Sequence, residues 1–132
     1  MARVPKDLTS RELEFLAERH LATLTTLRAD GSPHVVPVGF TFDPATGIAR
    51  VICSDGTQKV RNVEQATRIA VVCQVAGPAW LSLEGHGRVV RDSASVVEGE
   101  RRYAARYQAP RPNDRRVVIE VVVTRVLGRG PR

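Results

Sequence analysis

Apolar and polar residues alternate with a period of two along much of the chain. Between His34 and Phe42, the residues Val36, Val38 and Phe40 alternate with smaller or more polar neighbours. This pattern predicts a strand that buries one face. Five further runs are rich in Val, Ile, Leu and Thr and also favour strands, namely 21–27, 48–54, 68–75, 79–90 and 117–127. The sequence therefore predicts a mainly β protein with six strands.

Turn-forming residues separate these strands. The segments 29–33, 43–47 and 76–78 each contain Gly and Pro, which is typical of tight turns. We expect strand 48–54 to run antiparallel to strand 34–42 in a meander. Gly85 and Gly87 predict a bulge or bend in a curved sheet. His86 between them is interpreted as an exposed residue at this bend rather than as a catalytic group.

Helical signals occur at three places. Thr9 and Glu12 have the spacing of a capping box, which predicts a helix that ends near His20. Thr57 is a plausible cap for a short helix that begins after it. A longer helix is predicted over 93–108 and ends before Pro110. The expected total is therefore about three helices.

Composition places the chain among ordinary globular domains. It has 132 residues, of which 42% are hydrophobic and 26% charged, as in one folded domain covering 1–132. No stretch approaches the roughly 20 apolar residues of a membrane span, and no signal peptide is evident at the N-terminus. Cys53 and Cys73 lie in apolar runs, which favours buried thiols in a reducing compartment. We therefore expect a cytoplasmic protein without membrane contact.

The net charge of +6 predicts an anionic partner. Nucleic acid is not favoured, because the aromatic residues are not interleaved with Lys and Arg as on base-stacking surfaces. The three histidines are too scattered for the usual metal-ligand spacings, so no metal site is predicted. There is also no GxSxG motif, and neither cysteine has a recognisable base, which argues against covalent hydrolysis.

The segment from Ser54 to Asn62 is the most informative for chemistry. Lys59 and Arg61 occupy the first turn of the predicted helix, where cations are usually unfavourable. A bound phosphate would explain them, held by the hydroxyls of Ser54 and Thr57, by backbone N–H groups, by Lys59 and by Asn62. The alternative is a surface helix that tolerates a cation and uses its hydroxyl only as a cap.

A second feature lies in the strand after His34. Pro37 lacks an N–H and Gly39 lacks a side chain, and both interrupt an otherwise regular strand. Together they suit the close approach of a flat ligand. The alternative is that Pro37 lies at a sheet edge or a bulge, and the residues alone leave both interpretations open.

Nearly the whole chain resembles a known family. The segments 12–44, 48–63 and 106–121, together with WLSLEG at 80–85, resemble the deazaflavin-dependent reductases of the pyridoxamine-phosphate-oxidase-like superfamily, and in particular their biliverdin-reducing branch. The resemblance implies a six-stranded Greek-key split β-barrel that forms a homodimer. It also implies coenzyme F-420, with FMN as the alternative cofactor, in a groove at the subunit interface.

The resemblance assigns cofactor contacts in two groups, and it implies that His34, Val35, Val36, Pro37 and Val38 line the deazaflavin ring. Ser54, Thr57, Gln58, Lys59 and Asn62 would hold the phosphate side, and Gln74 and Arg88 would lie near the groove. The implied reaction is hydride transfer from reduced F-420 to a conjugated tetrapyrrole such as biliverdin. No side chain is assigned as catalytic, since solvent or an Arg-bound water could supply the proton. The alternatives are an FMN-dependent oxidase-like flavoenzyme and a non-catalytic carrier of F-420 or bilins.

Overall fold

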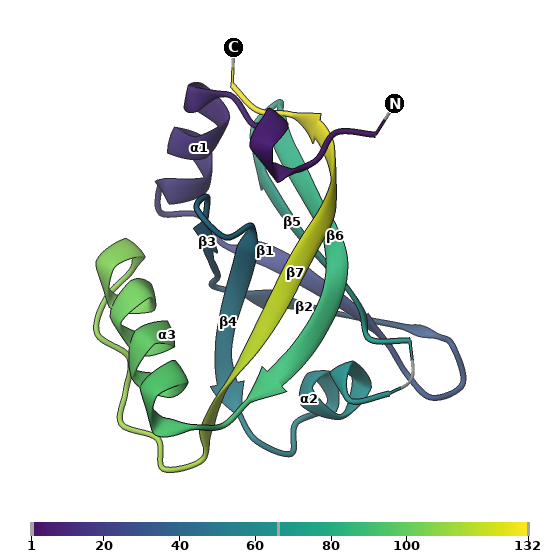
Figure 1. The fold of residues 1–132 in the computed structure, drawn as a ribbon, viewed down its shortest axis with the longest axis vertical. Helices are drawn as coiled ribbons and strands as arrows, with labels where there is room; N and C mark the ends of the chain where they lie inside the picture. The colour runs from purple at the N-terminus through teal and green to yellow at the C-terminus, as the bar shows by residue number, and fades with distance from the viewer. Residues whose placement is uncertain (1, 66, 132) are drawn as a thin grey trace.

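The computed structural model describes residues 2–65 and 67–131. Within them, seven strands form one antiparallel sheet of order β2-β1-β5-β6-β7-β4-β3, accompanied by three α-helices and one short 3-10 helix (Figure 1). The elements are η1 (Pro5–Asp7), α1 (Ser10–Ala17), β1 (Ala22–Leu27), β2 (Pro33–Val38), β3 (Thr41–Asp43), β4 (Ile48–Ser54), α2 (Gln58–Val63), β5 (Ile69–Ala76), β6 (Ala79–Val90), α3 (Ser93–Arg106) and β7 (Arg116–Arg129). The mainly β class and the three helices predicted from the sequence are confirmed.

The strand count differs from the prediction at one place, the run 34–42. This run forms two strands, because β2 pairs with β1 whereas β3 pairs with β4 at the opposite end of the sheet order. Gly39 and Phe40 make the corner between them. The Phe40 amide donates to the Tyr107 hydroxyl at 3.2 Å, so a side chain satisfies a backbone group that a neighbouring strand would otherwise bind. Of the two strands formed by the run 34–42, only β3 pairs with β4, so the predicted antiparallel pairing with strand 48–54 holds for Thr41–Asp43 and not for β2.

The core lies inside the curved sheet. Leu24, Val51, Val72, Leu83 and Ile119 come from five different strands and are buried almost completely. The predicted bulge is confirmed, because the register of β6 against β7 shifts between Glu84 and Gly85. Beyond the bulge, His86 is exposed on the outer face of the sheet, as the sequence predicts.

The capping box before α1 is also confirmed. The Thr9 hydroxyl accepts the Glu12 amide at 3.1 Å, and the Glu12 carboxylate accepts the Thr9 amide at 3.0 Å. The same carboxylate binds the Arg3 guanidinium and the Gly130 amide, at 2.8 and 3.1 Å. One buried carboxylate thus joins segments near both ends of the chain, which lie on the same side of the molecule in Figure 1. The helix itself ends at Ala17, earlier than His20.

Among the residues described, no helix combines the length and the apolar character required to cross a bilayer.

Candidate functional site

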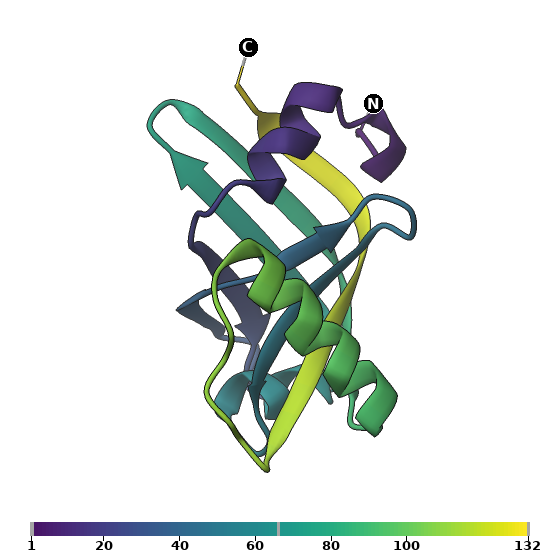
Figure 2. The ribbon, with the colours of Figure 1, turned by 90° about the vertical axis from the view of Figure 1, so that its left-hand side faces the viewer.

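A groove of about 450 Å³ opens where the ends of β2 and β4 meet the start of α2 and the segment that follows α3. Figure 2 shows α3 lying across β4, with the segment after it returning to β7. The groove is lined by Pro37, Val38, Gly39, Ile52, Cys53, Ser54, Thr57, Lys59, Tyr103, Gln108, Ala109, Pro110, Arg111 and Arg116. It therefore brings together the two features that the sequence singled out separately, the Pro37–Gly39 segment and the segment that begins at Ser54.

Three cationic side chains from three elements line the groove. They are Lys59 of α2, Arg111 of the segment after α3, and Arg116 of β7. Arg116 donates to the Glu100 carboxylate at 2.8 Å, and its Nε has no hydrogen-bond partner among the described residues. The positive charges of these lining residues favour an anionic ligand.

The thiol of Cys53 also lines the groove. Burial raises its pKa to about 11, and the nearby Lys59 ammonium opposes that rise only partly. Cys53 is therefore a neutral thiol at pH 7 and does not act as a nucleophile. Within the described residues there is also no group of three His, Cys, Asp or Glu side chains that could hold a metal ion.

Backbone and side-chain contacts hold the segment from Ser54 to Thr57 in place. Thr57 occupies the predicted N-cap position, but its hydroxyl donates to the Ser54 carbonyl at 3.0 Å and does not cap the helix. From outside, Arg91 binds both Asp55 and Glu64, with nitrogen–oxygen distances of 2.9 and 3.1 Å. Arg91 thus links Asp55, which precedes α2, to Glu64 at the C-cap of the helix.

Arg61 and Asn62 do not reach the groove. The Arg61 guanidinium turns back to the Gly56 carbonyl and to the Gln58 side chain. Because α2 has only six residues, Arg61 lies in its last turn and not, as predicted, in its first. Asn62 is 2% exposed, donates to Thr26 at 3.0 Å and accepts from Gln58 at 2.7 Å. Asn62 therefore anchors α2 to β1, and Gln58 lies beside it at the helix surface.

The strand β2 forms one end of the sheet, so Pro37 lies on an edge strand, as one of its two interpretations requires. Pro37 and Val38 line the groove, whereas His34, Val35 and Val36 precede it along the same strand. The buried Nδ1 of His34 has no hydrogen-bond partner among the described residues. Burial lowers the pKa of His34, and the charges of Arg28 and Lys59 lower it further, so this imidazole is neutral at pH 7.

The two remaining sequence-predicted residues lie elsewhere. Gln74 is fully buried, and its amide binds the Phe15 carbonyl at 2.8 Å and the Arg106 guanidinium. Arg88 is half-exposed and pairs with Glu120 at 2.9 Å. Neither residue lines the groove.

Several groove residues have no counterpart in the sequence prediction, above all Tyr103, Arg111 and Arg116. They come from α3 and from the RPNDRR segment. The sequence shows that this segment is basic, but it does not show where the segment lies in the fold. The pairing of β4 with β7 brings this segment to the groove, because it places Ser54 directly opposite Arg116.

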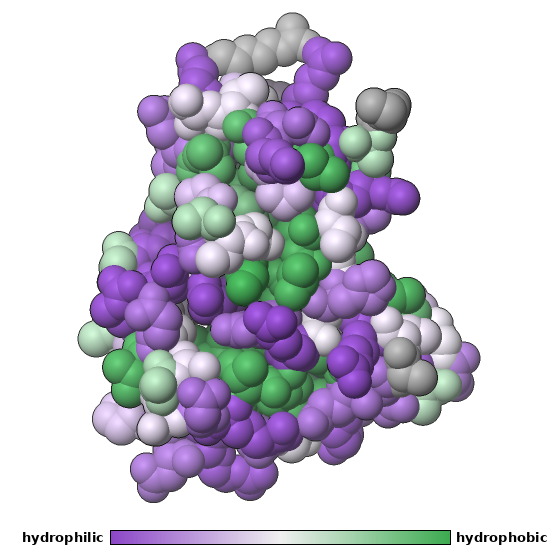
Figure 3. All heavy atoms as spheres, in the orientation of Figure 1, coloured by the Kyte–Doolittle hydropathy of each residue, from purple (hydrophilic) through white to green (hydrophobic). Residues whose placement is uncertain are grey.

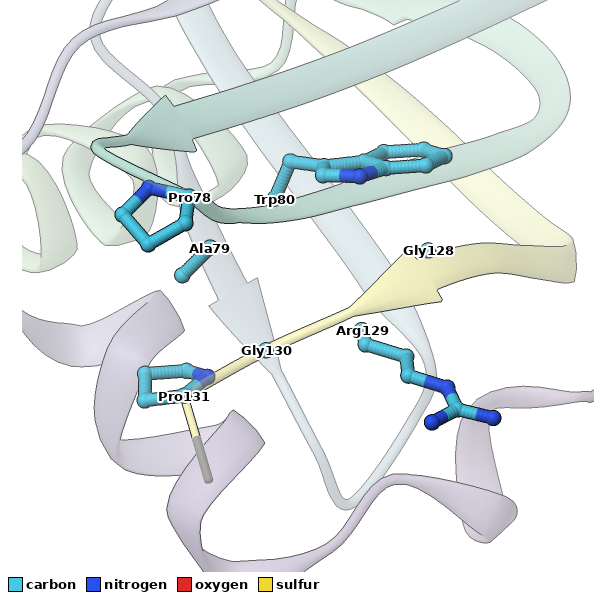
Figure 4. Close-up of a pocket in the computed structure, with 7 residues that line it drawn as sticks. All are labelled: Pro78, Ala79, Trp80, Gly128, Arg129, Gly130 and Pro131. Atoms are coloured by element: carbon cyan, nitrogen blue, oxygen red, sulfur yellow. The ribbon is translucent and has the colours of Figure 1, made fainter.

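A larger cavity of about 770 Å³ lies at the tip of the β5–β6 hairpin and the end of β7. Figure 4 shows its seven lining residues, among which Arg129 extends away from the Trp80 ring. Apart from Arg129, they are Pro78, Ala79, Trp80, Gly128, Gly130 and Pro131. Because this cavity offers almost no titratable or hydrogen-bonding side chains, the groove is the candidate site despite its smaller volume.

Comparison with known proteins identifies the family of the chain. Residues 8–130 match the family model described as pyridoxamine 5'-phosphate oxidase. The chain is 58% identical over 128 residues, 97% of this chain and 93% of the relative, to an F-420H2-dependent biliverdin reductase of Mycobacterium tuberculosis (strain CDC 1551 / Oshkosh). It is 35% identical over 66 residues, 48% of this chain and 46% of the relative, to a 5a,11a-dehydrotetracycline/5a,11a-dehydrooxytetracycline reductase of Streptomyces rimosus. The solved structure of an F-420 reductase shares the fold, with a TM-score of 0.68, 24% identity, and coverage of 86% of this chain and 94% of that chain.

Proposed function

The chain belongs to the pyridoxamine 5'-phosphate oxidase family, and on this premise we propose that it is a coenzyme F-420-dependent reductase. Its substrate in this proposal is a conjugated tetrapyrrole, and its reaction converts biliverdin to bilirubin. The observation that carries the proposal is the likeness, over almost the full length of both chains, to the mycobacterial biliverdin reductase. The chemistry of the groove supports it independently.

The groove offers what a deazaflavin with a phosphate-bearing tail requires. Pro37, Val38 and Gly39 line part of the groove with apolar groups and, at Gly39, with backbone that carries no side chain. Ser54, with its hydroxyl, and Lys59, with its ammonium, also line the groove. His34, which precedes the groove on β2, has a buried ring nitrogen that no described protein group binds. A groove that combines an apolar lining with hydrogen-bond donors and positive charge suits a flat, anionic cofactor.

The assignment of residues follows the resemblance to the family, adjusted to the contacts that the structure shows. Residues His34 to Val38 hold the ring from the β2 side, and the Ser54 hydroxyl and Lys59 bind the phosphate side. Thr57 supports that side through its hydrogen bond to the Ser54 carbonyl. Gln58 supports that side from the start of α2, and Asn62 acts through Gln58. When bound, reduced F-420 supplies the hydride. The protein orients the two flat molecules, excludes water between them and neutralises their anionic groups.

A homodimer is part of the proposal. Ile69, His86 and Val122 are cross-strand neighbours on the outer face of β5, β6 and β7. Ile69 and Val122 are 39% and 37% exposed. Figure 3 shows hydrophobic residues gathered in the middle of one face over β6 and β7, surrounded by hydrophilic ones. Such a row is typical of a surface that another copy covers.

Analytical ultracentrifugation tests the dimer. Val122→Asp should give a monomer, because it places a charge within the apolar row. Val97→Asp is the matched control, since Val97 is 62% exposed on α3 and lies outside that row. If the unmodified protein is a monomer, the proposed dimer is contradicted, but the groove remains the candidate site.

We further propose that the chain acts as one domain in the cytoplasm. Cys53 and Cys73 are both unbridged, which suits a reducing compartment.

A direct titration tests the cofactor and the reaction. Purified protein is titrated with F-420 and, separately, with FMN, and binding is followed by cofactor fluorescence. Reduced F-420 is then supplied together with biliverdin, and both absorbances are followed. The proposal expects binding of F-420 and coupled oxidation of F-420 with loss of biliverdin. Tight binding of FMN alone would overturn the cofactor assignment, and F-420 binding without turnover would identify a carrier.

A further inference from the structure

The Ser54 hydroxyl is bound by Asn113, a residue of the segment between α3 and β7. Asn113 Nδ2 lies 2.8 Å from Ser54 Oγ. The other end of the same amide, Oδ1, accepts the backbone N–H of Arg115 at 2.9 Å. Because a backbone N–H can only donate, Oδ1 must face Arg115, and the NH2 group must face Ser54. The orientation of the Asn113 amide is therefore determined by the backbone.

This orientation determines where the Ser54 proton can point. A serine hydroxyl has one proton and two lone pairs, and Asn113 occupies one of the lone pairs. Within residues 2–65 and 67–131, no protein acceptor takes the hydroxyl proton. Ser54 is half-buried and lines the groove. Its proton is therefore available to an acceptor in the groove.

Thr57 has the opposite polarity, although the sequence treats the two hydroxyls alike. Its proton is donated to the Ser54 carbonyl at 3.0 Å, which leaves lone pairs on its oxygen. Lone pairs repel an anionic oxygen, whereas a directed O–H attracts it. Of these two hydroxyls, that of Thr57 donates within the protein, and only that of Ser54 keeps its proton for a ligand.

We propose that Asn113 is a positioning residue that presets Ser54 as a hydrogen-bond donor to an anionic oxygen in the groove. This inference rests on the proposed function, because the anion considered is the phosphodiester of F-420. In this arrangement the charge of Lys59 attracts the phosphodiester, and the O–H of Ser54 determines where one of its oxygens lies. A donor that is oriented before binding loses little freedom when the ligand arrives, which raises affinity.

A double-mutant cycle tests the inference, with dissociation constants for F-420 measured by fluorescence titration. Ser54→Ala should weaken binding by about 10-fold, the usual effect of losing one hydrogen bond to a charged group. Asn113→Ala should weaken it by roughly 3-fold, because the hydroxyl can then turn away from the ligand. In the Ser54→Ala background, Asn113→Ala should have no further effect. That lack of additivity is a readout that a merely structural role of Asn113 would not produce.

Asn113→Asp inverts the polarity at nearly constant shape. Its carboxylate still accepts the Arg115 N–H, but it also accepts the Ser54 proton and withdraws it from the ligand. We expect Asn113→Asp to bind F-420 more weakly than Asn113→Ala while its melting temperature stays close to that of the unmodified protein. Asp114→Asn is the control for charge on the same segment and should change affinity by less than about 2-fold.

The outcomes separate the two proposals. If the unmodified protein does not bind F-420, the proposed function is overturned and this inference falls with it. If the unmodified protein binds F-420 but Asn113→Ala has the same effect with and without the Ser54 hydroxyl, only the positioning role of Asn113 is overturned. Binding by Asn113→Asp as tight as that of the unmodified protein would overturn it as well.

Discussion

Gly39 packs directly against the ring of Tyr103: a Cβ atom placed on Gly39 would lie 3.0 Å from Tyr103 Cε2 and 3.2 Å from Tyr107 Cε2. The two tyrosine rings are themselves in contact, with centroids 4.9 Å apart. Tyr103 lines the groove from α3, and Gly39 lines it from the end of β2. The missing side chain at position 39 is therefore what allows α3 to approach β2 and form the groove wall.

Gly39→Ala should both destabilise the protein and weaken binding of F-420. The added methyl group must displace one or both rings, and overpacking of this kind lowers stability by about 1–3 kcal/mol. Chemical denaturation and F-420 titration measure the two effects. Combining Gly39→Ala with Tyr103→Val removes one of the overlapping rings, so the double variant should be less destabilised than the sum of the single variants. Unchanged stability and affinity in Gly39→Ala would contradict this packing.

Lys59→Ala should weaken F-420 binding without unfolding the protein. The ammonium of Lys59 lines the groove and makes no hydrogen bond to the described protein groups, so its loss removes attraction to the ligand but little packing energy. Binding is measured at low and high salt, and the difference between variant and unmodified protein should shrink as salt screens the charge. Lys6→Ala, in η1 and outside the groove, is the matched control. Unchanged F-420 affinity in Lys59→Ala would remove Lys59 from the binding site.

Arg106→Ala should be among the most destabilising single substitutions in α3. The guanidinium donates to the carbonyls of Glu18 and Phe40 and to the Gln74 side chain, and it lies over the Phe40 ring at 4.7 Å. Removing it leaves buried acceptors without donors, which lowers the free energy of unfolding by about 3 kcal/mol. Denaturant titration provides the measurement. Arg101→Ala, which loses only an exposed ion pair with Glu98, should change stability little.

Stability should fall in acid as Glu12 takes up a proton. Hydrogen bonds from Arg3 lower the pKa of Glu12 to about 2, assisted by the Thr9 and Gly130 amides and opposed by burial. The unfolded chain has an ordinary pKa near 4.3, so the stabilisation is complete above that pH and is lost as the pH falls toward 2. The expected loss is about 2–3 kcal/mol.

Glu12→Gln provides the comparison for this pH dependence. The variant should be less stable at pH 7, and its stability should change less than that of the unmodified protein between pH 5 and pH 2. Melting temperatures measured across this range give the answer. Parallel pH profiles for the two proteins would show that Glu12 is not the group responsible.

Most of the strands could be predicted from the sequence because the burial of side chains along a strand is a local property. The alternation of Val36, Val38 and Phe40 is real, and each of these residues packs inward or against the core. The same alternation continues through the corner at Gly39, because turning a corner there does not change which side chains point inward. A pattern of residue types therefore could not reveal that β2 and β3 have different partners.

The site was predictable only where its residues are close in sequence. Ser54, Thr57 and Lys59 lie within six positions, and their chemistry is visible in one segment. Asn113 and Arg116 reach Ser54 through the pairing of β4 with β7, and no single-sequence pattern specifies that register. For Gln74 and Asn62 the sequence suggests exposed side chains near a ligand, because both residues are polar. In the structure both amides are buried and form hydrogen bonds inside the protein.

The corner at Gly39 and Phe40 has a thermodynamic consequence for the whole sheet. It connects the two terminal strands of the sheet order through only two residues, and one of those residues also lines the groove. Opening of the sheet at this corner would therefore also displace Gly39 from the lining of the groove. A molecule bound in the groove opposes that opening by mass action. Among the described residues, the Phe40 amide donates to the Tyr107 hydroxyl, and hydrogen exchange at this amide should accordingly slow as the groove is occupied.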